Sequence, residues 1–228
     1  MKEFMKKPLP NVNKEELNGK LIVVEGPDSS GRSTQISLLS KYLEMKGHGV
    51  IETGLKRSSL VSGELDEALK GNVLSPRTLT LFYATDFYDQ LENVIIPGLK
   101  AGFIVLSDRY IYTLMARAII RGAEREWIES IYEMAVVPDI VLYLLVPTPI
   151  LVERTFESHS QLDYWESGMD LGFSRDWFKS FLIYQRKMRL EFMKMAKRFH
   201  FEVVNGGRTP KSVDRDLKAR IARILNNE

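Results

Sequence analysis

The chain has 228 residues, 44% apolar and 27% charged, and this predicts one globular domain with a sizeable buried core. Its 32 basic and 30 acidic residues give a net charge of +2, which is too balanced to indicate a nucleic-acid partner. Cysteine is absent, so disulfides and thiolate metal sites are excluded. The longest apolar stretch, around residues 140–146, is too short to cross a bilayer, so we expect a cytoplasmic protein with no membrane partner.

Short apolar runs alternate along the chain with longer segments of helical spacing. The basic residues 1–19 form an N-terminal extension, either a disordered tail or a short helix packed on the body, before a single domain at 20–228. Strands are predicted at 21–25, 50–53, 103–107, 139–146 and 201–204, and helices at 33–45, 79–99, 112–121, 125–136, 177–198 and 212–225. This alternation predicts an α/β fold, a five-stranded parallel sheet flanked by helices. Polar residues after the strands should meet at one edge of that sheet, where ligands of such folds bind.

A glycine-containing loop directly follows the first predicted strand. Residues 26–33 match the pattern G-x-x-x-x-G-K-[ST], except that Arg32 stands in place of lysine. Backbone N–H groups of such a loop, with the start of the next helix, hold phosphate oxygens, so the fold resembles that of P-loop nucleoside triphosphate hydrolases. The alternative is a plain Gly/Ser turn. The residues expected to bind the nucleotide cofactor are Gly26, Pro27, Asp28, Ser29, Ser30, Gly31, Arg32, Ser33 and Thr34.

Arg32 keeps the positive charge of the expected lysine but has a different shape. An arginine is a planar fork that can grip two phosphate oxygens, whereas a lysine is a compact point charge. We therefore expect binding of a polyphosphate to be retained and Arg32 to gather charge on the leaving phosphates. The rate or the choice of donor can differ from that of a lysine-containing loop.

An acid–arginine pair follows the third predicted strand, in the tripeptide Asp108-Arg109-Tyr110. Asp108, together with the hydroxyl of Ser33, is predicted to hold Mg²⁺ near the phosphates. Arg109 is predicted to clamp a phosphoryl oxyanion. The alternative is an ordinary ion pair at the end of a strand, beside a packed tyrosine.

The segments GPDSSGRST, KRSS, LFYATDF, SDRYIYT and PDIVLYL resemble the thymidylate kinase family in order and spacing, over about residues 21–225. The resemblance implies transfer of the γ-phosphoryl group of ATP to dTMP, a requirement for Mg²⁺, and a homodimer. It implies that Asp28, Arg57 and Arg109 bind the acceptor nucleotide and that Tyr110 lies beside its nucleoside. It also implies that Arg154 acts near the lid, a flap over about residues 155–173, and that Arg208 flanks the donor base.

Four positions depart from the family pattern. Besides Arg32, the sequence has Phe87 after Asp86 where the family has arginine, and Ala118, with Arg117 beside it, near the position of a base-reading glutamine. The lid reads Asp163-Tyr164-Trp165-Glu166 and lacks its arginine. These departures bear on acceptor recognition and on charge stabilisation during transfer. Candidate acceptor-binding residues therefore include Arg117, with Phe82 and Phe87 as rings that can stack on a base.

The leading hypothesis is a nucleoside monophosphate kinase that acts on dTMP or a related pyrimidine nucleotide, with Arg32, Asp108, Arg109 and Arg154 as catalytic residues. A second hypothesis keeps the fold but changes the phosphoryl donor or the acceptor. A third is a catalytically weakened nucleotide-binding protein, which would bind nucleotides without turnover.

Overall fold

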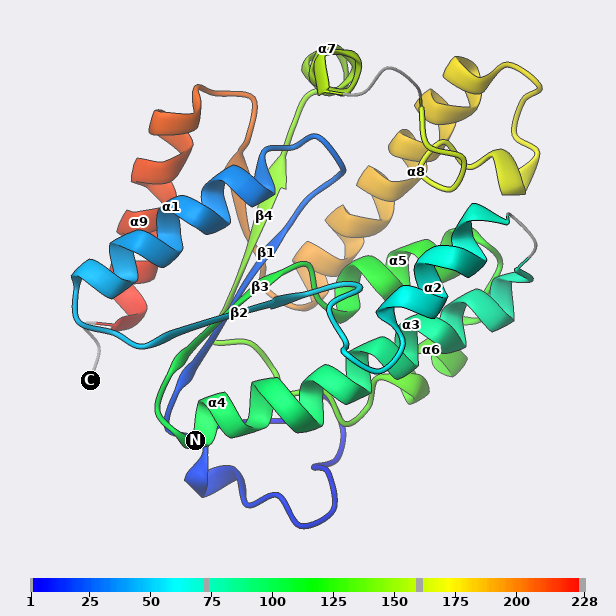
Figure 1. The fold of residues 1–228 in the computed structure, drawn as a ribbon. Helices are drawn as coiled ribbons and strands as arrows, with labels where there is room; N and C mark the ends of the chain where they lie inside the picture. Colours follow the sequence, from blue (N-terminus) through cyan, green and yellow to red (C-terminus); the bar gives the residue numbers. More distant parts are fainter. Residues whose placement is uncertain (1, 72–73, 159–161, 226–228) are drawn as a thin grey trace.

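The computed structural model describes residues 2–71, 74–158 and 162–225, and Figure 1 shows a single sheet with helices on both faces. The strands are β1 (Lys20–Glu25), β2 (Val50–Gly54), β3 (Ile104–Asp108), β4 (Ile140–Leu145) and β5 (Glu202–Asn205). Their order is β2-β3-β1-β4-β5, and all neighbouring strands are parallel. The predicted α/β class and five-stranded parallel sheet are confirmed. Among the described residues, no helix combines the length and apolar character that crossing a bilayer requires.

The helices follow the predicted segments, with two additions. They are α1 (Arg32–Met45), α2 (Ser62–Lys70), α3 (Pro76–Gln90), α4 (Ile96–Lys100), α5 (Ile111–Ile120), α6 (Arg125–Ile131), α7 (Thr148–Ser158), α8 (Trp177–Arg198) and α9 (Pro210–Leu225). The sequence did not predict α2 and α7. In α2 only Leu65 is buried, so the helix is a peripheral turn whose apolar pattern is too weak to detect.

Alternating side chains of β1 form two cores, one on each face of the sheet. Leu21 and Val23 belong to the larger core, which α3, α5 and α8 cover. Ile22 and Val24 belong to the other core, which α1 and α9 cover, as the grouping of helices in Figure 1 shows. A strand buried on both faces must be apolar throughout, which explains why it was recognisable in the sequence.

The long helix predicted at residues 79–99 is observed as a nearly continuous run from Pro76 to Lys100. It begins at Ser75, whose side chain accepts a hydrogen bond from the backbone N–H of Thr78, with Pro76 in the first turn. A π-helical segment (Leu91–Ile95) separates α3 from α4. Pro97, which lacks an N–H, follows directly, and this accounts for the break in the regular α-helical pattern.

The N-terminal residues pack on the body as an extended strap. Phe4 forms an antiparallel bridge with Val136, and the strap continues to a short 3₁₀ turn (Lys14–Glu16). Lys2 forms an ion pair with Asp139, whose carboxylate also accepts a hydrogen bond from the backbone N–H of Leu21 at 2.7 Å. These contacts contradict the disordered-tail alternative and attach the strap to the start of β1.

Candidate functional site

The loop between β1 and α1 forms one wall of a cavity of about 550 Å³ at the carboxyl edge of the sheet. Gly31 precedes α1 with φ of 90°, a backbone conformation that favours glycine. No side chain caps the first turn of α1, so its N–H groups and the positive end of the helix are available to an anion in the cavity. This geometry is that of a phosphate-binding loop.

The Arg32 side chain folds back beneath this loop and is only 7% exposed. Its Nη1 donates to the carbonyl oxygens of Gly26, at 2.6 Å, and of Pro27. Its Nε donates to Asp108 Oδ1 at 2.7 Å. Its Nη2 makes no hydrogen bond to any described residue and lies 3.6 Å from Asp28 Oδ1. Arg32 thus ties the loop to β3 and leaves Nη2 to reach a phosphate oxygen, whereas the sequence suggested a two-pronged grip.

Asp108 and Ser33 bring two oxygen ligands together beside the loop. Ser33 Oγ lies 3.4 Å from Asp108 Oδ2, and the other oxygen of Asp108 faces Arg32. In the described part of the chain, no group of three or more His, Cys, Asp and Glu side chains is arranged to hold a metal ion. Magnesium commonly uses one or two protein oxygens and completes its shell with waters and phosphate oxygens. The pair Ser33 and Asp108 therefore fits Mg²⁺ bound together with a nucleotide.

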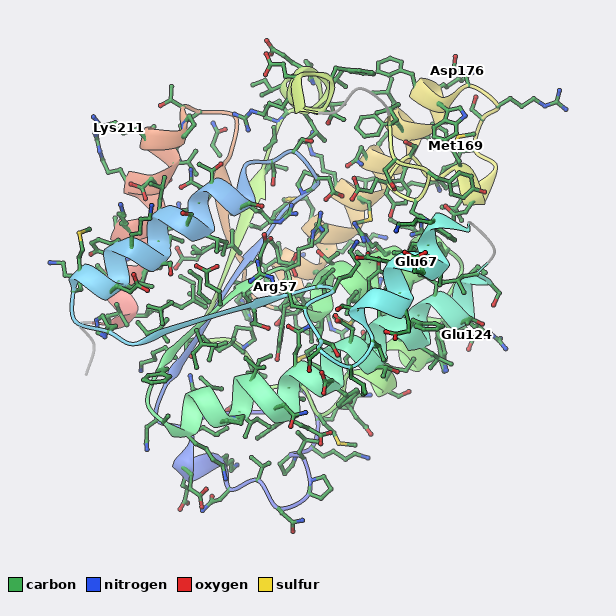
Figure 2. The ribbon with its side chains drawn as sticks, in the orientation of Figure 1. Arg57, Glu67, Glu124, Met169, Asp176 and Lys211 are labelled. Carbon is green, nitrogen blue, oxygen red and sulfur yellow. The ribbon has the colours of Figure 1, made fainter. Side chains whose placement is uncertain are left out.

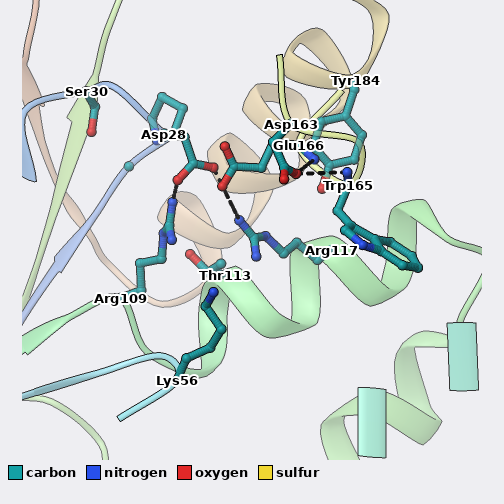
Figure 3. Close-up of polar contacts among 12 residues, drawn as sticks. Asp28, Ser30, Lys56, Arg109, Thr113, Arg117, Asp163, Trp165, Glu166 and Tyr184 are labelled. Carbon is teal, nitrogen blue, oxygen red and sulfur yellow. Dashed lines mark hydrogen bonds and ion pairs between the residues drawn. The ribbon is translucent and has the colours of Figure 1, made fainter. Parts of the chain in front are cut away.

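A second set of charges faces the loop from β3 and α5 (Figure 3). Asp28 lies between two arginines: its Oδ1 pairs with Arg109 Nη2, and its Oδ2 accepts from Arg117 Nη2 at 3.2 Å. The lid residue Glu166 lies 3.6 Å from Arg117. Arg109 Nε is buried and has no hydrogen-bond partner among the described residues, so it is a donor without an acceptor. An anion beside Arg109 would satisfy this donor.

Burial lowers the pKa of Arg109 to about 10, and the neighbouring Arg117 contributes in the same direction. Both arginines are therefore protonated at neutral pH. The two guanidinium groups face two carboxylates, Asp28 and Glu166 of the lid, so the charges of this corner are balanced. A phosphate oxygen can take the place of a carboxylate oxygen as the acceptor of guanidinium hydrogen bonds.

Glu25, the last residue of β1, is fully buried behind the loop. Desolvation raises the pKa of its carboxyl group from 4.5 to about 7, against the opposing effect of hydrogen bonds from Thr113 and Tyr110. The folded protein thus keeps a proton that the unfolded chain releases between about pH 4.5 and 7, as linkage requires.

We therefore expect the free energy of unfolding to fall as the pH rises through this interval and to level off above it. The contribution of Glu25 to this fall is up to about 3 kcal/mol, at about 1.4 kcal/mol for each pKa unit. Glu25→Gln removes the titration. Urea unfolding of both proteins from pH 5 to 8 should show the wild type losing stability relative to the variant. A difference that stays constant with pH would contradict the prediction.

The comparisons with known proteins agree with this geometry. The sequence profile of the family described as Thymidylate kinase matches residues 24–216. The chain belongs to the thymidylate kinase family. It is 34% identical over 212 residues to "Probable thymidylate kinase 2" of Saccharolobus solfataricus, covering 92% of this chain and 99% of that protein. It is 30% identical over 213 residues to "Thymidylate kinase" of Thermosipho africanus, covering 90% and 99%.

The residues predicted to lie near the donor of this thymidylate kinase-family protein gather at the phosphate-loop cavity. Arg154 and Arg208 both line it. Arg154 donates to the backbone oxygens of Ser30, at 3.3 Å, and Gly206, at 3.0 Å, and so links the phosphate loop to the loop after β5. Arg208 is held by Asp216 at 2.5 Å. The predicted lid includes residues 159–161, which lie outside the described residues.

Arg57 lies in the loop after β2 (Figure 2). Its side chain is 42% exposed and lies 3.9 Å from Glu52. Asp86 holds this loop by accepting hydrogen bonds from the backbone N–H groups of Lys56, at 2.8 Å, and Ser58, at 2.9 Å. Asp86, the residue before the departure at Phe87, is thus a buried aspartate that fixes the loop carrying Arg57.

The structure corrects two aromatic predictions, those for Phe87 and Tyr110, and leaves the prediction for Phe82 untested. Phe87 is 4% exposed and packs edge-on against core rings, among them Tyr110 at 5.3 Å between centroids, so it does not face the site. Tyr110 is 2% exposed and donates its hydroxyl to the backbone oxygen of Val136 at 3.0 Å, so it supports the core and does not lie beside a nucleoside. Phe82 is partly buried against the same core. Helical spacing alone could not distinguish a helix face that meets the core from one that meets the site.

Sequence reasoning missed two residues that the structure brings into this region. Glu25 carried a signal, because a carboxylate at the end of an apolar strand must find buried partners. Trp165 carried no signal in the sequence, because its contacts join the lid to α2, a helix that was not predicted. Its Nε1 donates to the backbone oxygen of Leu69 at 3.0 Å.

Proposed function

We propose that this chain is a thymidylate kinase that transfers the γ-phosphoryl group of ATP to dTMP. The observation that carries the proposal is the placement of Arg109 and Arg117 against Asp28 of the phosphate loop, with Asp108 paired to Arg32 of the same loop. A donor phosphate in the loop and an acceptor phosphate at Arg109 would meet beside the Ser33 and Asp108 oxygens. The family membership and the relatives' names support the choice of dTMP.

The protein's part in this reaction is to position the reactants and to neutralise charge. The N–H groups of the loop and of the first turn of α1 hold the donor phosphates, and Arg32 Nη2 adds one cationic donor. Arg154 and Arg208 close the donor side, while Arg109, with its unpaired Nε, binds the acceptor phosphate. Mg²⁺, held by Ser33 and Asp108, would supply further charge neutralisation on the phosphate oxygens.

The acceptor base would bind between α3 and α5, where the cavity now holds only about 20 Å³. Tyr83, Leu114 and Ala118 line this cavity together with Trp165. The other lining residues lie on helices or at a helix end, so Trp165, in the lid, is the part that can move to admit a base. Arg121 holds it by donating to its backbone oxygen at 2.9 Å and by stacking on its ring at 5.8 Å.

Trp165→Ala should tighten binding of dTMP about five- to 100-fold, because the nucleotide no longer has to break the bond to Leu69 and the cation–π contact, each worth about 0.5–1.5 kcal/mol. Isothermal titration calorimetry measures the change, and Trp177→Ala, at another partly exposed tryptophan of this region, is the control. Weaker binding by Trp165→Ala would mean that the indole contacts the base and does not block it.

A cytoplasmic location stays a prediction.

We also propose that the protein is a homodimer. Leu81 is 52% exposed on α3. It borders a hollow of about 710 Å³ that Trp127 of α6 also lines. An exposed leucine beside such a hollow, whose lining also includes Arg77 and Glu124, supports association. Analytical ultracentrifugation of the wild type and of Leu81→Glu tests the dimer, which the variant should weaken.

A matrix of phosphoryl donors and nucleoside monophosphate acceptors, assayed with Mg²⁺, tests the proposed reaction. Turnover with ATP should be greatest with dTMP. Arg32 and the lid without arginine favour a second candidate, a phosphotransferase of the same fold with another donor or acceptor, and the same matrix reveals it. Nucleotide binding without product from any pair would support the weakened nucleotide-binding protein and refute the kinase.

A further inference from the structure

The Glu25 carboxylate is buried at the back of the site and has no part in the reaction described so far. It is 0% exposed, and among the described residues it forms no ion pair within 4 Å. A buried carboxylate without a cationic partner destabilises a protein unless hydrogen bonds satisfy it. The groups that hydrogen-bond to it therefore show what it stabilises.

Glu25 caps α5 from a neighbouring strand. Its Oε1 accepts from the backbone N–H groups of Tyr110, at 2.9 Å, and Thr113, at 3.3 Å. Its Oε2 accepts from the Thr113 hydroxyl at 2.5 Å. Tyr110 is the N-cap residue of α5 and supplies no side-chain cap. A carboxylate at the start of a helix satisfies its unpaired N–H groups and interacts favourably with its positive end.

The residue before this cap, Arg109, has an unusual backbone conformation. Its φ is 70°, in the left-handed region that a long side chain rarely adopts, and such a conformation persists only where its surroundings enforce it. On one side its N–H donates to the backbone oxygen of Val24 at 3.0 Å. On the other side Glu25 holds the N–H of Tyr110. Two consecutive residues of β1 thus fix the backbone on both sides of Arg109.

The backbone conformation of Arg109 sets the direction of the two arginines expected to bind the acceptor phosphate, Arg109 and Arg117 (the acceptor arginines). With the turn fixed, the Arg109 guanidinium meets Asp28, and Arg117, one turn after Thr113 on α5, reaches the same carboxylate (Figure 3). Glu25 is also the residue directly before Gly26, where the phosphate loop begins. One residue therefore joins the start of the donor loop to the backbone that carries the acceptor arginines.

We propose that Glu25 is a positioning residue for phosphoryl transfer, holding the Arg109 turn and the start of α5 so that Arg109 and Arg117 face the acceptor phosphate. This inference rests on the proposed function. Glu25 acts through hydrogen-bond acceptance by its side-chain oxygens, and it does not touch the substrate.

Steady-state kinetics of Glu25→Ala and Glu25→Gln test the proposal. Glu25→Ala removes the hydrogen bonds that hold the backbone N–H groups at the start of α5, so it should lower kcat/KM for dTMP about 10- to 100-fold. KM for ATP should change less than about threefold, because the loop N–H groups remain. Glu25→Gln keeps an oxygen acceptor and should recover most of the loss. Equal losses for ATP and dTMP, or no recovery with glutamine, would overturn the proposal.

A double-mutant cycle with Arg109→Ala separates positioning from a general loss of structure. If Glu25 acts through Arg109, Glu25→Ala should add less than about twofold in a protein that already lacks this side chain. Additive effects would overturn the proposal. If Glu25→Ala does not fold, Thr113→Val, which removes only the hydroxyl bond, takes its place and should raise KM for dTMP severalfold while leaving KM for ATP unchanged. If the wild type is inactive with every acceptor, the proposed function is refuted. The affinities of the wild type and of Glu25→Ala for dTMP, measured by calorimetry, would then test the role of Glu25 separately.

Discussion

Arg32→Ala is expected to lower kcat for phosphorylation of dTMP by about a thousandfold or more, the scale associated with arginines that stabilise transferring phosphoryl groups. The physical reason is twofold. Nη2 is the cationic donor left for a phosphate oxygen, and the bonds to Gly26 and Asp108 keep the loop against β3. Without the side chain, Asp108 loses its cationic neighbour, and the loop loses the hydrogen bonds that hold it against β3.

Arg32→Lys tests whether the positive charge alone is sufficient at this position. A single ammonium group cannot replace Nε, Nη1 and Nη2 together, so we expect kcat to fall about 10- to 100-fold although the family's usual residue has been restored. Rapid-quench measurement of one turnover reports the chemical step, and Arg198→Ala, which breaks a remote surface pair with Glu129, is the control. Faster turnover with lysine would show that the loop is not built around arginine and would support the weakened-enzyme hypothesis.

Arg109→Ala should reduce kcat/KM for dTMP about 100- to 1,000-fold and leave KM for ATP nearly unchanged. Removal of one preorganised donor to a developing oxyanion typically costs about 2.7–4 kcal/mol. The loss here includes an acceptor contact and leaves Asp28 with Arg117 as its nearest remaining cation. Steady-state kinetics with each substrate varied in turn measure the effect. A change confined to KM for ATP would place Arg109 on the donor side and contradict the account.

The sheet and its flanking helices were predictable because their residues obey simple patterns. β1 and β4 are apolar on both faces, and the long helices repeat buried positions at helical spacing, so strand and helix segments could be separated by period and length. The phosphate loop was recognisable because glycines at fixed spacing, preceded by a strand and followed by a helix, have few other uses.

The site was predictable by residue type more than by geometry. Asp28, Arg109 and Arg117 were expected near the acceptor, and the structure places them together, but their mutual pairing depends on the left-handed turn at Arg109. The sequence of this turn does not reveal its conformation, because arginine rarely adopts it. The direction of Arg32 was equally hidden, since it depends on loop carbonyl oxygens that every sequence contains.

We propose that donor and acceptor meet between the phosphate loop and Arg109. The most direct measurement is a crystal structure with Mg²⁺ and a bisubstrate analogue in which adenosine and thymidine are joined by five phosphates. We expect adenosine beside Arg208, phosphates in the loop, and thymidine between α3 and α5. Trp165 should be displaced, and Arg109 should contact the phosphate nearest the thymidine. An empty loop, or a thymidine end bound away from Arg109 and Arg117, would contradict it.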